Sequence, residues 1–216
     1  MRREDLALYV VTDPSLAGSR GVEATCALAL AAGPRVIQLR DKVAPTRVLV
    51  EQARRLVALC ARHDAILILN DRLDVALAAG AHGVHLGQDD LPAADARRLI
   101  GSEGILGLSV RTPEEARAAE EVGADYIAAN LVFSTSTKTD LEGPIGLEGV
   151  RALRRATRLP LVAIGGIHPG NAADVVAAGA DGVAVVSAVM AAPDVGLACR
   201  ALLGAVEVGR ARRAAG

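Results

Sequence analysis

Polar and charged residues gather directly after short apolar runs of this sequence, where parallel strands would present their chemistry. Cations, carboxylates, amides and hydroxyls all occur at these points. Such a set suits phosphorylated molecules, because cations neutralise phosphate charge and carboxylates hold divalent metals. The residues at these ends are Gln38, Leu39, Arg40, Asp41, Lys42, Asn70, Asp71, Asp90, Ser109, Thr135, Ser136, Thr137, Lys138, Gly166, Val186 and Ser187.

Two carboxylates are candidate ligands for a metal ion. Asp71 and Asp90 follow neighbouring apolar runs, so their oxygens could meet at one edge of a sheet. A pair of carboxylates with open positions suits Mg²⁺, which keeps waters and bridges to phosphates. Each aspartate could instead cap the helix that follows it. With Arg40, Lys42 and Lys138 in the same pattern, a site for Mg²⁺ and a diphosphate is the favoured interpretation.

A second phosphate site is indicated near the end of the chain. Gly165-Gly166 follows the seventh apolar run and Val186-Ser187 ends the eighth. Glycine permits close approach of a backbone to phosphate, and a serine hydroxyl adds a donor. In α/β barrels, the loops after the last two strands commonly hold phosphate at a helix N-terminus. A tight turn is the simpler alternative for the glycines.

Lysine is rare in this chain. Only two of the 24 basic residues are lysines, Lys42 and Lys138, and both fall within the polar segments above. Where arginine is so freely used, a lysine can mark a place that needs a compact point charge. Codon bias with two chance survivors is the alternative.

Strand-like runs alternate with alanine-rich helical patterns from end to end. We expect strands over 6–13, 36–42, 65–71, 83–88, 105–110, 126–132, 160–165 and 182–187. Helical patterns include 45–63 and 112–122, the second opening with an N-cap, a proline and two acids. Eight such units predict an α/β fold, a single (β/α)₈ TIM barrel over 1–216, with its active site at the carboxyl ends of the strands. We expect 210–216 to be frayed.

A doubly wound open sheet is the alternative architecture. That fold would carry a glycine-rich dinucleotide turn after its first strand. The sequence has Thr12-Asp13-Pro14 there. A zinc site at His82 and His85 is also disfavoured, because residues three apart on a strand point to opposite faces.

Composition excludes several classes of partner. The formal net charge is −1 and the only aromatic residues are Tyr9, Tyr126 and Phe133, which argues against nucleic-acid binding. No run reaches the length of a membrane span, and no signal segment is expected at the N-terminus. Three widely spaced cysteines indicate buried reduced thiols in a cytoplasmic protein. The expected partners are small molecules, and no signal sets an oligomeric state.

Several of these segments together resemble the thiamin phosphate synthase family, in order and over almost the whole chain. They are Tyr9-Val10-Val11-Thr12-Asp13, Gln38-Leu39-Arg40-Asp41-Lys42, Asn70-Asp71-Arg72, Gly83-Val84-His85-Leu86-Gly87-Gln88-Asp89-Asp90, Thr135-Ser136-Thr137-Lys138 and Ala163-Ile164-Gly165-Gly166-Ile167. The resemblance implies a Mg²⁺-dependent transferase. It would join hydroxymethylpyrimidine diphosphate to thiazole phosphate, with the thiazole nitrogen displacing diphosphate.

The resemblance also implies roles for residues. Gln38 to Lys42, Asn70, Ser109 and Lys138 would bind the pyrimidine diphosphate, and Asp71 and Asp90 would hold Mg²⁺. Thr135 to Thr137, Gly166, Val186 and Ser187 would bind the thiazole phosphate. Arg40, Lys42 and Lys138 would act in catalysis, because they can stabilise the charge that grows on the leaving diphosphate. The electron-rich pyrimidine would support a dissociative path that needs no general base.

The sequence departs from the family pattern beside the thiazole phosphate segment. Asn130-Leu131 stands where Gly-Pro is usual, Ala128 replaces a common glycine, and Ser134 replaces a proline. Asp41 also replaces a usual glutamate. Two alternatives remain open, a thiazole tautomerase on the same barrel and a non-catalytic protein that binds thiamin precursors. Retention of Asp71, Gln88, Asp90 and Lys138 favours the synthase.

Overall fold

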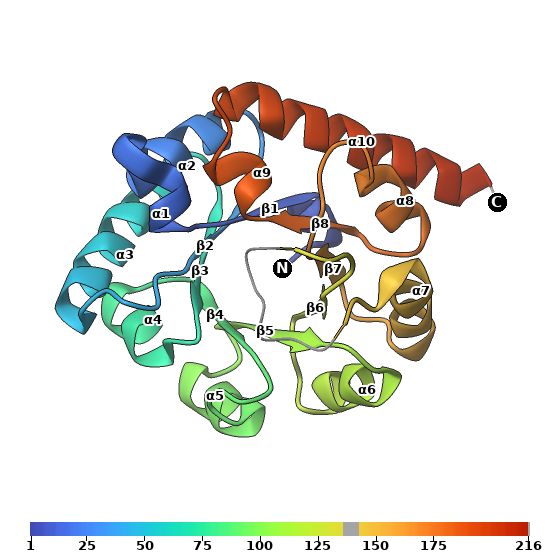
Figure 1. Cartoon of the computed structure of the whole chain (residues 1–216). Coiled ribbons are helices and arrows are strands. Elements are labelled where there is room, and N and C mark those ends of the chain that lie inside the picture. Colours follow the sequence, from blue (N-terminus) through green and yellow to red (C-terminus); the bar gives the residue numbers. More distant parts are fainter. Residues whose placement is uncertain (136–142, 216) are drawn as a thin grey trace.

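Eight parallel strands close into a barrel in which every strand pairs with its neighbours in sequence order (Figure 1). The computed structural model describes residues 1–135 and 143–215. The strands are β1 (Leu8–Val11), β2 (Val36–Leu39), β3 (Ile66–Asn70), β4 (Gly83–Leu86), β5 (Ile105–Val110), β6 (Tyr126–Asn130), β7 (Leu161–Ile164) and β8 (Gly182–Val185). The expected (β/α)₈ barrel is confirmed, and the open sheet is excluded because β1 pairs with β8. Most strands are shorter than expected because their polar ends belong to loops.

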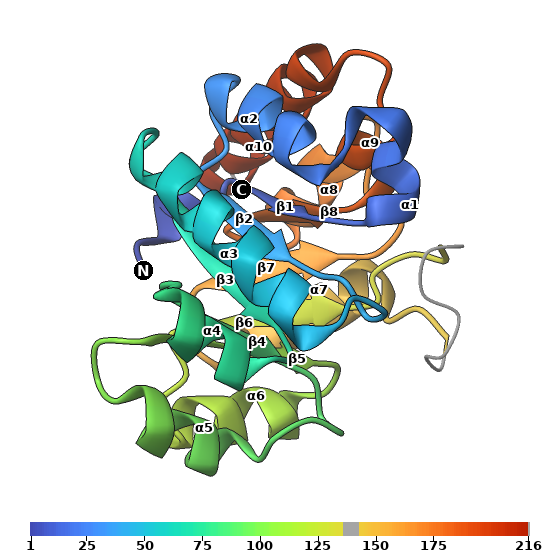
Figure 2. The ribbon, with the colours of Figure 1, turned by 90° about the vertical axis from the view of Figure 1, so that its left-hand side faces the viewer.

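Helices surround the barrel on all sides (Figure 2). They are α1 (Pro14–Ala17), α2 (Val22–Ala31), α3 (Thr46–Ala61), α4 (Leu73–Ala79), α5 (Ala93–Ile100), α6 (Pro113–Glu121), α7 (Gly146–Ala156), α8 (Ala172–Ala177), α9 (Ser187–Met190) and α10 (Val195–Ala215). Two short 3₁₀ turns are η1 (Arg3–Leu6) and η2 (Gly18–Arg20). The expected start of α6 is confirmed, since Thr112 and Glu115 form a capping box around Pro113.

The two-residue alternation of each strand sorts its side chains between two cores. Tyr9 and Val11 of β1 point into the barrel, whereas Leu8 and Val10 pack against the helices. The outer layer is built from leucine, valine and alanine, as the scarcity of aromatic residues requires. This alternation decides which residues near a strand end can reach the barrel mouth.

The three cysteines lie in helices of the outer layer. Cys26 in α2, Cys60 in α3 and Cys199 in α10 are all buried and unpaired, as expected. Burial raises the pKa of Cys60 and Cys199 to about 11, so these thiols stay protonated. Within the described part of the chain, no helix has the length and apolar character that crossing a membrane requires.

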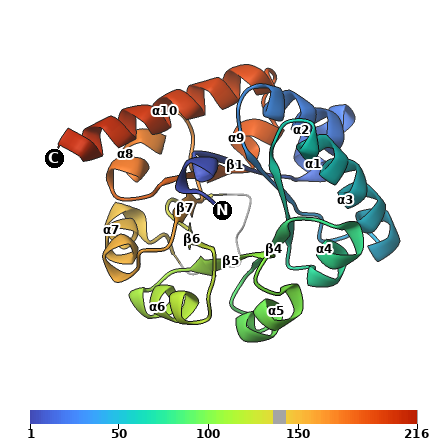
Figure 3. The same cartoon turned by 180° about the vertical axis from the view of Figure 1, so that it is seen from behind.

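Buried Asp181 links several elements at the amino-terminal end of the barrel. Its carboxylate accepts from the backbone N–H of Leu161 at 2.9 Å and from the Arg154 guanidinium at 3.3 Å. Arg3 in η1 also pairs with it, and Figure 3 shows the N-terminal segment lying across this end of the barrel. Arg213 of α10 donates to the carbonyl of Ala180 at 2.9 Å. The expectation of a frayed 210–216 is therefore wrong for 210–215, where α10 continues to Ala215.

Candidate active site

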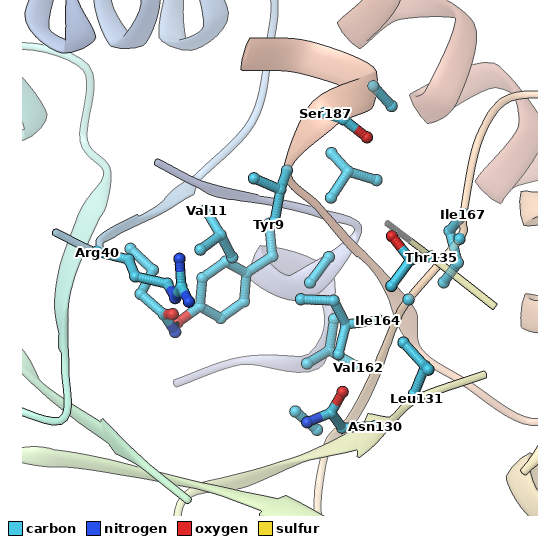
Figure 4. A pocket seen from close by; sticks show the side chains of 18 of the residues that line it. Tyr9, Val11, Arg40, Asn130, Leu131, Thr135, Val162, Ile164, Ile167 and Ser187 are labelled. Carbon is cyan, nitrogen blue, oxygen red and sulfur yellow. Dashed lines mark hydrogen bonds between the residues drawn. The ribbon is translucent and has the colours of Figure 1, made fainter. Parts of the chain in front are cut away.

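A pocket of about 370 Å³ opens at the carboxyl ends of the strands. Figure 4 shows its interior, with Arg40 on one side and Thr135 and Ile167 on the other. The residues that line it are Tyr9, Val11, Gln38, Arg40, Asn70, His85, Ser109, Ala128, Asn130, Leu131, Thr135, Val162, Ile164, Gly165, Gly166, Ile167, His168, Ala184, Val185, Val186, Ser187 and Ala188.

A chain of hydrogen bonds between buried side chains forms the floor of this pocket. Gln38 Nε2 donates to Tyr9 Oη at 2.8 Å, and Tyr9 Oη lies 2.8 Å from Tyr126 Oη. His85 joins the chain through both ring nitrogens, with Nδ1 at 3.0 Å from Tyr126 Oη and Nε2 at 2.9 Å from Ser109 Oγ. We call these five residues the floor network. It combines side chains from β1, β2, β4, β5 and β6.

The floor network is tightly packed. Burial raises the pKa of both phenols, so Tyr9 and Tyr126 remain protonated at any physiological pH. The His85 ring stacks on Tyr126 with centroids 5.5 Å apart. Gly107 makes room for this arrangement, because a Cβ there would come within 2.1 Å of the Tyr126 ring. A floor of hydrogen-bond donors and acceptors suits a heteroaromatic ring better than it suits a phosphate.

The two predicted metal ligands come together beside the pocket. The pKa of Asp71 is raised to about 6, mainly by burial and then by a hydrogen bond to Asp90, while Lys42 and Arg40 oppose the rise. The Lys42 ammonium lies 3.9 Å from Asp71 Oδ2. Asp90 Oδ2 accepts from the backbone N–H of Gly87 at 2.7 Å, which holds this carboxylate in place.

The alternative role of these aspartates as helix caps is wrong. The N-cap of α4 is Arg72 and that of α5 is Pro92, and neither helix has a side-chain cap. Asp71 instead adopts a left-handed backbone conformation with φ of 62°, which is unusual for a residue other than glycine. No cluster of three or more histidine, cysteine or acidic side chains suited to a metal occurs among the described residues. A cation at this pair would take its other ligands from water or substrate.

The backbone of Arg40 is fixed by a neighbouring strand end. Thr12 Oγ1 accepts from the Arg40 N–H at 2.9 Å and donates to the Arg40 carbonyl at 3.1 Å. Thr12 is fully buried, so this pair of bonds holds the segment against β1. The Arg40 side chain lines the pocket and the Lys42 side chain is 54% exposed near its rim.

Glycines after β7 form the opposite wall. Gly166 has φ of 63°, and a Cβ there would come within 2.6 Å of the Ser134 carbonyl oxygen. Asn171 Nδ2 donates to the Gly166 carbonyl at 2.9 Å and so holds the loop. Ser187 begins α9 directly across the pocket mouth and Thr135 lies beside this wall (Figure 4). We call Thr135, Gly166, Val186 and Ser187 the cradle.

The structure brings together most, but not all, of the predicted substrate contacts. Those that line the pocket are Gln38, Arg40, Asn70, Ser109, Thr135, Gly166, Val186 and Ser187. The Leu39 side chain does not line the pocket, because it is buried in the outer core. The Asp41 carboxylate accepts from the backbone N–H groups of Val43 and Ala44, both at 3.0 Å, and does not line the pocket. Ser136, Thr137 and Lys138 lie outside the described residues.

Sequence reasoning missed His168, in the loop after β7, and three polar pocket residues on strands, Tyr9, His85 and Asn130. Alternation along β1, β4 and β6 could have found the three strand residues, since each shares its parity with an inward-facing residue. The His82 side chain does not share the surroundings of His85, as expected for residues three apart on a strand. His82 Nδ1 accepts from the N–H of Leu67 at 3.1 Å, at the start of β3.

Comparison with known proteins identifies the family of this chain. A family described as "Thiamine monophosphate synthase" matches residues 8–189. The chain belongs to this family. The thiamine-phosphate synthase of Moorella thermoacetica is 53% identical over 195 residues, which cover 90% of this chain and 93% of that protein. The thiamine-phosphate synthase of Chloroflexus aurantiacus is 52% identical and covers 94% of both chains.

A solved structure of this thiamine monophosphate synthase family has the same fold. The thiamine phosphate pyrophosphorylase of Pyrococcus furiosus superposes with a TM-score of 0.88 at 42% identity, covering 96% of this chain and 98% of that one.

Proposed function

We propose that this protein is a transferase that condenses hydroxymethylpyrimidine diphosphate with thiazole phosphate to give thiamin phosphate and diphosphate. One observation carries the proposal: the pocket has a floor of hydrogen-bonded polar side chains suited to a ring, and groups suited to phosphate lie on both sides of it. Arg40, Lys42 and the carboxylate pair lie at one end, and the cradle lies at the other. The relatives are named thiamine-phosphate synthases, which agrees with thiamin phosphate as the product.

The carboxylate pair fits Mg²⁺. Asp71 and Asp90 share a hydrogen bond, and burial together with the nearby Asp90 raises the pKa of Asp71. A cation between the two carboxylates would relieve the repulsion between them. Two carboxylates with remaining positions open for water and phosphate oxygens are typical of Mg²⁺ sites. When bound, Mg²⁺ would supply positive charge to the diphosphate as it leaves.

Three cations of this chain would act on the leaving diphosphate. Arg40 lines the pocket and Lys42 lies beside Asp71, so both could contact phosphate oxygens. Lys138 is assigned to the same task on the family resemblance alone. Charge grows on the diphosphate as its bond to the pyrimidine methylene breaks, so these cations would stabilise the transition state more than the bound substrate.

The floor network would hold the pyrimidine ring. Gln38 and Ser109 offer donors and acceptors at its two ends, and Asn70 adds an amide on the pocket wall. Because the floor network contains no carboxylate, it would bind the ring without neutralising the positive charge that develops on the methylene carbon. Leu39 and Asp41 would contribute to binding through their main-chain atoms.

The cradle, with Ser136 and Thr137, would hold the thiazole phosphate. Glycine at 166 leaves the backbone accessible, and the Ser187 hydroxyl is available as a donor. The thiazole nitrogen would then face the methylene carbon across the pocket. Holding both reactants in one cavity replaces a bimolecular encounter with a positioned attack. The unpaired thiols support a reducing, cytoplasmic setting.

The decisive experiment supplies the purified protein with both substrates and Mg²⁺. We expect thiamin phosphate and diphosphate in equal amounts, and no product after chelation. Conversion of a thiazole phosphate into its tautomer, without condensation, would identify a tautomerase instead. Tight binding of a precursor with neither reaction would identify a binding protein.

A further inference from the structure

Asn130 places an amide side chain in the pocket wall between the floor network and the cradle. It is the last residue of β6 and faces the barrel interior with Tyr126 and Ala128, which share its parity. The residue is only 8% exposed. Figure 4 shows its amide group directed into the pocket, at the opposite end of the labelled set from Ser187.

The Asn130 amide differs from the other buried amide of the pocket. Gln38 donates to Tyr9 at 2.8 Å, whereas no hydrogen bond of the Asn130 side chain occurs among the described residues. The backbone carbonyl of Asn130 already accepts a hydrogen bond from Arg111 Nη1 at 3.2 Å. The group of this residue that could bond a ligand is therefore the side-chain amide. No fully buried side-chain N or O atom among the described residues lacks a partner, so the Asn130 amide is open to the pocket space, where a ligand can bond it.

The surroundings of the amide indicate what this ligand presents. Leu131, Val162 and Ile164 line the same part of the pocket and offer only apolar surface. An apolar wall with a single amide suits a flat ring that carries one hydrogen-bonding position at its edge. A phosphate would not be stable there, since no cation faces it from these residues.

The position of Asn130 assigns the ring to one of the two substrates. Asn130 pairs with Ile164 in the parallel ladder of β6 and β7, and Ile164 is followed by Gly165-Gly166 of the opposite wall. The amide therefore lies on the strand pair that leads into the cradle. The floor network reaches β6 only at Tyr126, the first residue of that strand, and its other members come from β1, β2, β4 and β5.

We propose that Asn130 is a specificity-determining residue that hydrogen-bonds the azole ring of the phosphorylated acceptor. This inference rests on the function proposed above. The bond goes to an edge position or substituent of the ring other than the attacking nitrogen, because a donor on that nitrogen would occupy the lone pair that forms the new bond. The amide thus fixes the rotation of the ring while the cradle holds its phosphate.

The experiment compares Asn130→Ala with a control variant, Thr157→Val. Thr157 is equally buried but fully partnered, donating to Glu120 at 2.7 Å and accepting from the N–H of Leu159 at 3.1 Å, away from the pocket. Binding of thiazole phosphate alone is measured by calorimetry, the KM of each substrate by steady-state kinetics, and the Tm by thermal unfolding.

For Asn130→Ala we expect thiazole phosphate to bind about three- to tenfold more weakly, the effect of one neutral hydrogen bond. Its KM should rise by a similar factor, the KM for the pyrimidine diphosphate should stay within about twofold, and the Tm should not fall. Thr157→Val should show the reverse, with a lower Tm and unchanged binding.

Two results would overturn the inference: unaltered thiazole phosphate binding in Asn130→Ala, or a rise in both KM values with a lower Tm. The second would show a structural role. If the unaltered protein neither binds thiazole phosphate nor forms product, the proposed function itself fails, and this outcome is distinct from both.

Discussion

Replacing Asp71 by asparagine should stabilise the metal-free protein at neutral pH while abolishing its response to Mg²⁺. The pKa of Asp71 is about 6 in the folded protein, against an ordinary value of 3.8. The folded state therefore binds a proton more tightly than the unfolded state between these two pH values. It follows that the free energy of unfolding falls as the pH rises from about 4 to about 6, and that the loss persists above pH 6.

The size of this effect follows from the same two values. At about 1.4 kcal/mol for each pKa unit, the ionised Asp71 lowers the stability of the metal-free protein by up to about 3 kcal/mol at pH 8. Asparagine keeps the shape without the charge. For a chain of this length, about 1 kcal/mol corresponds to roughly 2–4 °C, so Asp71→Asn should unfold up to about 6–12 °C higher at pH 8 and at a similar temperature near pH 4.

Thermal unfolding in chelator and in Mg²⁺, from pH 4 to pH 8, measures both parts of this prediction. Mg²⁺ should raise the Tm of the unaltered protein, because it binds only the folded state, and leave that of Asp71→Asn unchanged. The matched control is Asp89→Asn, which removes the same charge from an exposed residue next to Asp90. Equal pH profiles for the protein and Asp71→Asn, or equal Mg²⁺ responses, would refute the reasoning.

Three further changes separate binding from stability. Ser187→Asp should raise the KM for thiazole phosphate at least tenfold by repulsion, with little effect on the pyrimidine diphosphate; equal damage to both would contradict the two-ended pocket. Tyr126→Phe should cost about 1–3 kcal/mol in chemical unfolding, because Tyr9 and His85 lose a shared partner, and a variant as stable as the parent would dismiss the floor network as an energetic unit. Asp181→Ala should cost about 3–5 kcal/mol, because it leaves buried arginine charge uncompensated, while kinetic constants measured below its Tm should not change.

The sequence predicted the barrel because each element carried its own signal. Eight apolar runs, helical patterns between them and a clear capping sequence at Thr112 all agreed with one architecture. The position of α10 was not predictable, because its end is held by long-range bonds from Arg213 and its neighbours to the Asp181 region. Such contacts join elements that local patterns cannot relate.

The candidate site was predicted by residue type and partly misjudged by orientation. Asp71, Arg40 and Ser187 were singled out because a polar or charged side chain directly after an apolar run is conspicuous in the sequence. Leu39 was included on the strength of its neighbours, although the alternation of β2 turns it toward the helices. The role of Tyr126 was missed because a buried aromatic residue in a strand has the same appearance in a sequence whether it packs or binds.

The chain contains two tyrosines and no tryptophan, and both tyrosines belong to the floor of the pocket. All tyrosine absorbance and fluorescence of this protein therefore originates at the place where the substrates would meet. A ligand that enters the pocket changes the surroundings of Tyr9 directly and those of Tyr126 through a bond of 2.8 Å. The two tyrosines are therefore an intrinsic optical probe of this site. Binding can be followed through their signal in real time, without a label and without background from tyrosine or tryptophan elsewhere in the chain.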